Sequence, residues 1–321
     1  MNGLRKPEQT PANPRNSGFT LIELLIVIGI IALLIGLLAP AVMSAIRAAR
    51  DAEVRTEISQ LDAAITSFQA EYGGIAPPSQ ITIYEFGDPG ASPPTGWYSA
   101  NAARSRAIIR RIWPQFNFDT TQASNPPYDF NGDGDELDQF TLTAQECLVF
   151  FLGGLRVGTN GPLVGFSKNP ARPFETGGNR VGPFFEFDIG RLTETGGNAN
   201  APEYLDPLPS QTNPYVYLSS YDGRGYVRTE AATVGMCYAY LQPGLFEDLN
   251  CNGSLDSGED QNANSVLDIQ AAFKPNTHQI ISPGADGLYG TGGVYDGQNY
   301  IAPSREDEDN ITNFGQGRLT P

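Results

Sequence analysis

Residues 19–42 read FTLIELLIVIGIIALLIGLLAPAV, and this stretch decides the architecture of the chain. Its only ionisable side chain is Glu23. As a helix it would cover roughly 36 Å, which is enough to cross the core of a bilayer. The preceding residues 1–18 are polar and rich in proline, and they carry Arg5, Lys6 and Arg15. Positive charge before a spanning helix predicts a cytoplasmic N-terminus and an exported remainder.

Two ordinary interpretations of this segment compete. A cleaved secretory signal has a shorter apolar region, of about 7 to 15 residues. A plain signal anchor explains the length of the segment but leaves Glu23 unexplained. A carboxylate inside a spanning helix costs on the order of 3 kcal/mol and is by default functional. Glu23 is therefore a candidate functional residue.

Residues 18–25, GFTLIELL, resemble the cleavage and methylation motif of type IV pilins and type II secretion pseudopilins. The resemblance implies cleavage after Gly18 by a prepilin peptidase, N-methylation of Phe19, and assembly through Glu23. Pro40 resembles the proline that interrupts the helix of this family. The implied partners are other pilin or pseudopilin subunits, in a homopolymer or a mixed filament, and an inner-membrane assembly platform.

Cleavage at this place would create a charge pair between subunits. The new amine at Phe19 is a cation that can reach the Glu23 carboxylate of a neighbouring subunit. In hydrocarbon each charge is costly alone and tolerable as a pair. Pairing therefore favours staggered insertion of each new subunit beside the previous one.

The helix is expected to continue beyond the membrane. Apolar residues recur there every three or four positions, which indicates one buried helical face. They are Val54, Ile58, Leu61, Ile65 and Phe68. Gly73 and Gly74 supply a C-terminal stop. We expect one helix of about 50 residues, kinked or locally melted near Pro40 and packed on a sheet by its second half.

The predicted fold is α+β and type IV pilin-like, with a long N-terminal helix packed on an antiparallel sheet that carries loop-rich insertions. Its parts are a leader peptide (1–18), a transmembrane and filament-core helix (19–42), an amphipathic continuation (43–74) and an exported globular domain (75–321). Within that domain, strands are expected at 81–86, 214–218, 233–240 and 279–282, and helices at 104–113 and 144–152. Residues 143–146 (TAQE) form a capping box that opens the second of these helices.

The composition restricts the possible partners of the globular domain. Asp and Glu number 36 against 20 Lys and Arg, and this charge repels phosphate backbones, so nucleic-acid binding is not expected. Such a surface suits divalent cations better. Of the cysteines, Cys237 and Cys251 are the more plausible disulfide pair; the alternative is three unpaired thiols with Cys147 buried in a helix.

Residues 248–259 fit the pattern of an EF-hand calcium loop, because oxygen-bearing side chains recur at the required positions and Gly253 permits the sharp turn. The candidate ligands are Asp248, Asn250, Asn252, Asp256 and Glu259. A weaker second copy follows at Asp260, Asn262, Asn264 and Asp268, with Ser265 in place of the glycine. A third start lies at Asp129, Asn131, Asp133 and Asp135. Asx-turns that need no metal are the alternative for all three.

A second, narrower resemblance lies near the C-terminus. Residues 213–217 (NPYVY) and 281–287 (ISPGADG) look like the C-terminal half of the major pseudopilin of type II secretion. That resemblance implies a Ca²⁺ site with Asp286, Asp307 and Asp309 as ligands. A solvated acidic tail is the alternative.

No catalytic activity is expected. The single histidine, His278, has no partners at a catalytic spacing, and no nucleophile elbow, phosphate-binding loop or zinc spacing is present in the sequence. The sequence therefore favours a pseudopilin-like structural subunit of a type II secretion pseudopilus. The alternatives are a type IV pilus or minor pilin subunit, for adhesion or DNA uptake, and a membrane-anchored calcium-binding module that does not polymerise. The expected location is the inner membrane, single-pass, with the globular domain in the periplasm before filament assembly.

Overall fold

The computed structural model describes residues 19–129, 134–156, 161–194, 201–269, 271–295, 300–301 and 306–319. The chain forms two compact units, Met1–Ala49 and Arg50–Pro321. One long helix and a set of small antiparallel sheets make up its regular structure, so the predicted α+β class is confirmed.

The long helix α1 extends over Leu21–Glu71 without a break. Pro40 lies inside it. A kink or local melting was expected there, and the helix does not melt, because proline removes a single helical hydrogen bond, which a long helix tolerates. Gly73 and Gly74 follow the helix with φ of 69° and 85°, and the Gly74 amide donates to the carbonyl of Gln69. This is the glycine stop that the sequence predicts.

The second half of α1 buries the expected stripe. Its side chains are buried in the larger of two core clusters, and Ala64 joins them there: the full set is Val54, Ile58, Leu61, Ala64, Ile65 and Phe68. The Phe68 ring makes edge contacts with Phe151 and Phe184, with centroids 5.9 and 5.4 Å away. Aromatic contact therefore closes the end of the stripe.

The central sheet has the order β13-β10-β9, formed by Ile311–Thr312, His278–Ser282 and Val216–Ser219. Both pairings are antiparallel, with Ile280 opposite Tyr217. Side chains alternate between the two faces of a strand. Tyr217 and Ile280 belong to the core cluster of the α1 stripe, whereas Val216 and Ile281 belong to the second cluster. The sheet thus divides the two cores.

A second antiparallel pair consists of β1 (Ile81–Tyr84) and β4 (Gln139–Leu142). The buried helix α3 (Ala144–Gly153) follows β4. The predicted capping box of α3 is present: Thr143 and Glu146 cap each other's backbone at its start. Helix α2 (Ala103–Ile112) ends, as expected, before Pro114. The remaining elements are η1 (Ala100–Ala102), η2 (Ile189–Arg191), α4 (Arg228–Ala232), β2 (Gly87–Asp88), β3 (Thr95–Gly96), β5 (Phe166–Ser167), β6 (Arg180–Val181), β7 (Leu192–Thr193), β8 (Glu203–Tyr204), β11 (Val294–Tyr295) and β12 (Tyr300–Ile301).

The strand predicted at 233–240 is wrong. The chain there leaves α4 through a turn in which Gly235 has a φ of 83°, and then runs without regular structure. Cys237 forms a disulfide with Cys251, which confirms the pair that the sequence favours, and Cys147 is buried and free. The disulfide to a loop and the preceding turn constrain this segment, and it does not pair as a strand.

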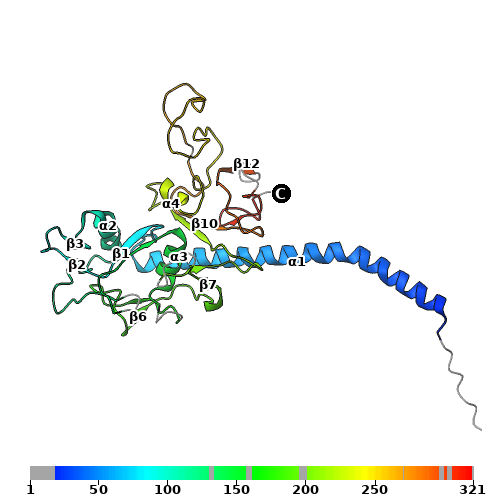
Figure 1. Cartoon of the computed structure of the whole chain (residues 1–321), viewed down its shortest axis with the longest axis horizontal. Helices are drawn as coiled ribbons and strands as arrows, with labels where there is room; N and C mark the ends of the chain where they lie inside the picture. Colours follow the sequence, from blue (N-terminus) through cyan, green and yellow to red (C-terminus); the bar gives the residue numbers. More distant parts are fainter. Residues whose placement is uncertain are drawn as a thin grey trace, which may run out of the picture. The chain divides into compact units, whose positions relative to one another are not determined.

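The segment between α4 and β10 is a long loop that extends beyond the helices and strands around it (Figure 1). It contains both Asp- and Asn-rich repeats, residues 248–268. Within the described part of the loop, its ends are paired by isolated bridges, such as Phe246 with Ile269. Local side-chain interactions therefore determine the shape of this loop.

Candidate functional site

The first candidate site is the start of α1. The Glu23 carboxylate accepts hydrogen bonds from the Thr20 backbone amide at 2.9 Å and the Thr20 hydroxyl at 2.7 Å. These contacts cap the helix start. Phe19 is 81% exposed, and the apolar side chains that follow it up to Ile46 are exposed as well. Gly18 lies outside the described residues. Of the described helices, α1 alone is long and apolar enough to cross a membrane.

Acidic residues in the second half of α1 bond to residues elsewhere in the Arg50–Pro321 unit. Glu57 accepts hydrogen bonds from the hydroxyls of Tyr204 and Tyr215, at 3.0 and 2.9 Å, and it forms an ion pair with Arg191. Asp51 receives two hydrogen bonds from Arg318, at 2.9 and 3.0 Å. The helix is therefore attached by charge as well as by its apolar stripe.

Asp62 makes a third attachment. Its Oδ1 lies 2.8 Å from His278 Nε2 and 3.0 Å from Asn313 Nδ2, with the Lys274 ammonium at 3.8 Å. The hydrogen bond with His278 is the main cause that lowers the pKa of Asp62 to about 2, against the opposing effect of burial. His278 could be a catalytic residue by its type alone, but here its side chain links β10 to α1 through Asp62.

This low pKa predicts how stability depends on pH. A carboxyl whose pKa is lower in the folded chain stabilises the fold above its unfolded pKa, near 3.8, and loses that contribution as the pH falls through about 2. We expect an Asp62→Asn variant to have a lower urea midpoint than the parent at about pH 5, with the difference shrinking between about pH 4 and pH 2. Glu53→Gln, an exposed change on the same helix, is the control. A difference that stays constant down to pH 2 would contradict this attachment.

The first Asp- and Asn-rich loop is folded around its own carboxylates. The two oxygens of Asp248 accept from the amides of Asn252 and Gly253, at 2.9 and 2.8 Å. Glu259 accepts from the amides of Asn250 and Asp256, at 3.2 and 3.0 Å, and so closes the loop. The side-chain amides of Asn250 and Asn252 donate to Asp256 and lower its pKa.

The second loop repeats this arrangement. Asp260 accepts from the amides of Asn264 and Ser265, at 3.0 and 2.9 Å. The side-chain amides of Asn262 and Asn264 donate to Asp268, each at 2.7 Å. Ser265 has a φ of 58°, so it adopts the left-handed turn that Gly253 makes in the first loop.

Glu247 is a residue that our sequence analysis missed. It is fully buried, and its carboxylate accepts from the amides of Gln261 and Asp268, at 2.8 and 3.0 Å. It therefore closes the second loop as Glu259 closes the first. The signal was present in the sequence, because Glu247-Asp248 and Glu259-Asp260 begin two aligned copies of one short repeat. A search for internal repeats finds it.

The donor set of these loops suits a hard cation. Glu247, Asp248 and Glu259 are at most 6% exposed, and within the described residues none of the three forms an ion pair. Buried carboxylates normally have a cation or a metal as partner. In the part of the chain that the structure describes, however, no three His, Cys, Asp or Glu side chains already converge in metal-binding geometry. The amides of the loop satisfy the carboxylates instead.

Three contacts hold the first loop to the rest of the unit. Cys251 is bonded to Cys237, the Arg228 guanidinium donates to the carbonyls of Cys251 and Asn252, and the Tyr238 hydroxyl donates to Asp248 at 2.6 Å. The sequence pattern predicts the loop but not these three contacts. The loop is thus pre-shaped at its N-terminal half.

The third predicted loop is described in part. Asn131 and Asp133 lie outside the described residues. Asp129 accepts a hydrogen bond from the amide of Gly134 at 3.3 Å, and Asp135 caps the amide of Leu137 at 2.9 Å. Both contacts are turn contacts of the kind that Asx side chains make.

Near the C-terminus, the structure places the predicted residues in two groups. One oxygen of Asp309 accepts from the amides of Ala285 and Asp286, at 2.6 and 3.1 Å, while its other oxygen is buried and has no hydrogen-bond partner among the described residues. Burial and the neighbouring Asp286 raise the pKa of Asp309. Asp307 is fully buried and accepts from the Tyr240 hydroxyl at 2.7 Å and the Gly292 amide at 3.0 Å. The structure therefore joins Asp286 with Asp309, and Asp307 bonds elsewhere.

Comparison with known proteins addresses the N-terminal segment. The family model described as the prokaryotic N-terminal methylation motif matches residues 13–39. The chain carries a prepilin-type, type IV pilin-like N-terminus. The motif implies processing by prepilin peptidase, and together with the apolar helix it indicates membrane anchoring among pilin-type subunits. No curated protein and no solved structure matched the chain.

Proposed function

We propose that this pilin-like chain is a structural subunit of a type II secretion pseudopilus, cleaved after Gly18 and methylated at Phe19. The observation that carries the proposal is the methylation motif on a helix whose first half exposes apolar side chains on every face. Such a helix requires lipid or other helices around it. Glu23 places a single carboxylate where the neighbouring subunit's amine can pair with it.

Processing and orientation follow from the same segment. Prepilin peptidase would act on the cytoplasmic side of the inner membrane, where the basic residues 1–18 stay. The unit from Arg50 onward would lie in the periplasm and then on the filament, which an assembly platform in the membrane builds. No catalytic role is part of this proposal.

The choice of secretion over a pilus is supported by the C-terminal turn. Residues 281–287 resemble the turn of the major pseudopilin, and Asp309 of the acidic loop bonds to this turn at Ala285 and Asp286. Asp309 also has a buried oxygen to which no described residue donates a hydrogen bond, and a second carboxylate, that of Asp286, lies nearby. A cation bound by Asp286 and Asp309 would relieve their repulsion.

We also propose that the two repeat loops bind Ca²⁺. The first loop would use Asp248, Asn250, Asn252, Asp256 and Glu259; the second would use Asp260, Asn262, Asn264, Asp268 and Glu247. Buried carboxylates without an ion-pair partner among the described residues support this assignment. When bound, the ion supplies charge neutralisation and a rigid link between distant parts of each loop.

Deletion of the gene in the native cell tests the choice between machines. If the chain is a pseudopilus subunit, its deletion should leave secreted proteins trapped in the periplasm while surface pili persist. A type IV pilus or minor pilin subunit would give the reverse, loss of pili or of DNA uptake with secretion intact, and that result would overturn the secretion assignment. Plasmid-borne wild-type chain should restore the phenotype, and a Gly18 variant that blocks cleavage should not.

A further inference from the structure

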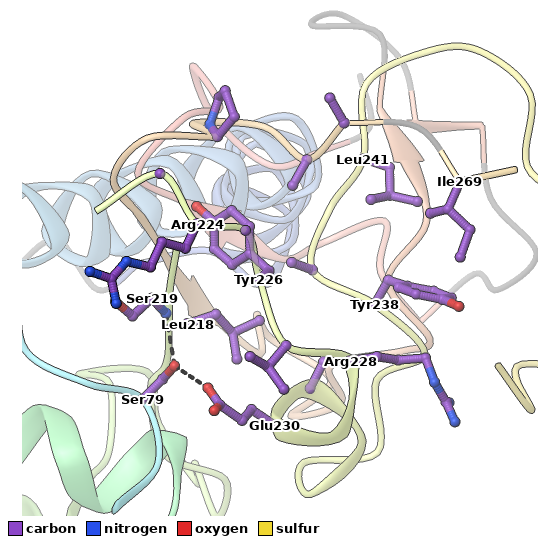
Figure 2. Close-up of a pocket in the computed structure, with 18 of the residues that line it drawn as sticks. Ser79, Leu218, Ser219, Arg224, Tyr226, Arg228, Glu230, Tyr238, Leu241 and Ile269 are labelled. Atoms are coloured by element: carbon purple, nitrogen blue, oxygen red, sulfur yellow. Dashed lines mark hydrogen bonds between the residues drawn. The ribbon is translucent and has the colours of Figure 1, made fainter. Parts of the chain in front are cut away.

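A pocket of about 450 Å³ lies between the end of β9, helix α4 and residues 269 and 271–276. In Figure 2, Ser79, Ser219 and Arg224 lie on one side of it and Tyr238, Leu241 and Ile269 on the other. Its size falls within the range of small-molecule sites, about 300 to 1,000 Å³. Neither the N-terminal motif nor the Asp-rich loops give this pocket a role.

The lining of the pocket is mainly apolar. Leu218, Ala231, Leu241 and Ile269 contribute aliphatic surface. The polar tips of its aromatic residues point to other partners: the Tyr226 hydroxyl donates to the Lys274 carbonyl at 2.8 Å. The Tyr238 hydroxyl is likewise bound to the first Asp-rich loop. The rings are therefore left as further apolar surface for a ligand.

The one carboxylate in the lining is neutralised. Glu230 is 1% exposed and forms an ion pair with Arg104. The same carboxylate accepts from the hydroxyls of Ser79 and Tyr221, at 2.5 and 2.7 Å. A buried carboxylate with these partners presents little negative charge to the pocket.

Two arginines of the lining form no ion pair with a carboxylate among the described residues. Arg224 is exposed and makes no hydrogen bond or ion pair with any residue that the structure describes. Arg228 donates to two neutral backbone carbonyls and has no carboxylate partner among the described residues. The pocket is thus an apolar cavity with two arginines at its edge, in a chain of net charge −16. Such a site attracts a negative ligand with an apolar body.

We propose that this pocket binds a small amphipathic anion, an apolar body of one or two rings or a short acyl chain that carries a single carboxylate. Its apolar part would replace water against Leu218, Leu241 and Ile269, and its carboxylate would pair with Arg224. This function is additional to filament assembly and does not depend on it.

The probe is the anion 1-naphthoate. Neutral 1-naphthamide and cationic 1-naphthylmethylammonium have the same ring system but a different charge, so they show how binding depends on charge. Binding is measured by ligand-observed NMR to the full chain in lipid nanodiscs, against empty nanodiscs, in both Ca²⁺ and EDTA. We expect naphthoate to bind with a Kd below about 1 mM, and the cationic analogue to bind at least about tenfold more weakly. Binding in EDTA separates this site from the calcium proposal.

Two variants test the position of the site. The variant Ala271→Trp places a large side chain at an exposed residue of the lining, so that it fills the pocket. Ala123→Trp is the matched control at an exposed residue outside the lining. We expect naphthoate binding to be lost in Ala271→Trp alone. Arg224→Gln should weaken naphthoate about tenfold and leave naphthamide unchanged, whereas Lys168→Gln should alter neither. Equal naphthoate binding by Ala271→Trp and wild type, or no preference for the anion over the cation, would overturn the proposal.

Discussion

A Glu23→Ala variant is expected to reach the membrane and to be processed, yet to be absent from filaments. In the proposed filament the substitution removes the carboxylate that would pair with the amine of a neighbouring subunit, so that amine would lie in hydrocarbon without a partner. An unpaired charge there costs on the order of 3 kcal/mol per subunit, which is enough to shift assembly more than 100-fold. The readout is the fraction of the chain recovered in sheared or cross-linked filaments, relative to the membrane pool.

The matched control is Glu53→Ala. Glu53 is an exposed acid on the same helix, located after the apolar stretch, so its removal should leave filament incorporation unchanged. Normal incorporation of the Glu23→Ala chain would contradict the assembly role. It would favour the alternative of a membrane-anchored calcium-binding module that acts without polymerising.

Removal of calcium is expected to give the largest change in stability. A ligand that binds the folded state alone at about 100 times its Kd adds about 2.7 kcal/mol per site, which for a unit of this size raises the Tm by roughly 5 °C or more. The full chain in detergent micelles should therefore melt at a lower temperature in EDTA than in Ca²⁺. Mg²⁺ should restore less of the loss, because it prefers a tighter octahedral shell.

Charge-neutral variants assign this effect to the two loops. Glu259→Gln should reduce the calcium-induced rise in Tm by removing the carboxylate that closes the first loop. Glu247→Gln should do the same for the second loop. Glu71→Gln, at the exposed end of α1, is the control and should retain the full rise. Identical Tm values in EDTA and Ca²⁺ for the parent chain would contradict calcium binding by the loops.

Periodicity and capping made the helical parts predictable from sequence. The α1 stripe, the glycine stop and the capping box of α3 depend on residues close together in the chain, so local patterns reveal them. The strands at 216–219 and 278–282 were also identified, because they are apolar and flanked by turn residues. The segment 233–240 has a similar apolar content but is constrained by a disulfide and a turn, and it forms no strand with the described residues.

Contacts between distant residues were beyond the reach of sequence patterns. Asp51, Glu57 and Asp62 lie outside the apolar stripe of the helix, and no local pattern indicates that each bonds to a residue more than 130 positions away. Asp307 resembled a ligand beside Asp309, but its side chain bonds to the Tyr240 hydroxyl instead. Glu247 closes a loop that begins 13 residues later at Asp260, and its role depends on how the two repeats fold together.

The central claim is that this chain is a processed, prepilin-type subunit, and the mature N-terminus tests it most directly. Mass spectrometry of the protein purified from its native membrane should find a chain that starts at Phe19 and is one methyl group heavier at that amine. A chain that begins at Met1, or one cut after Ala45, would contradict the claim.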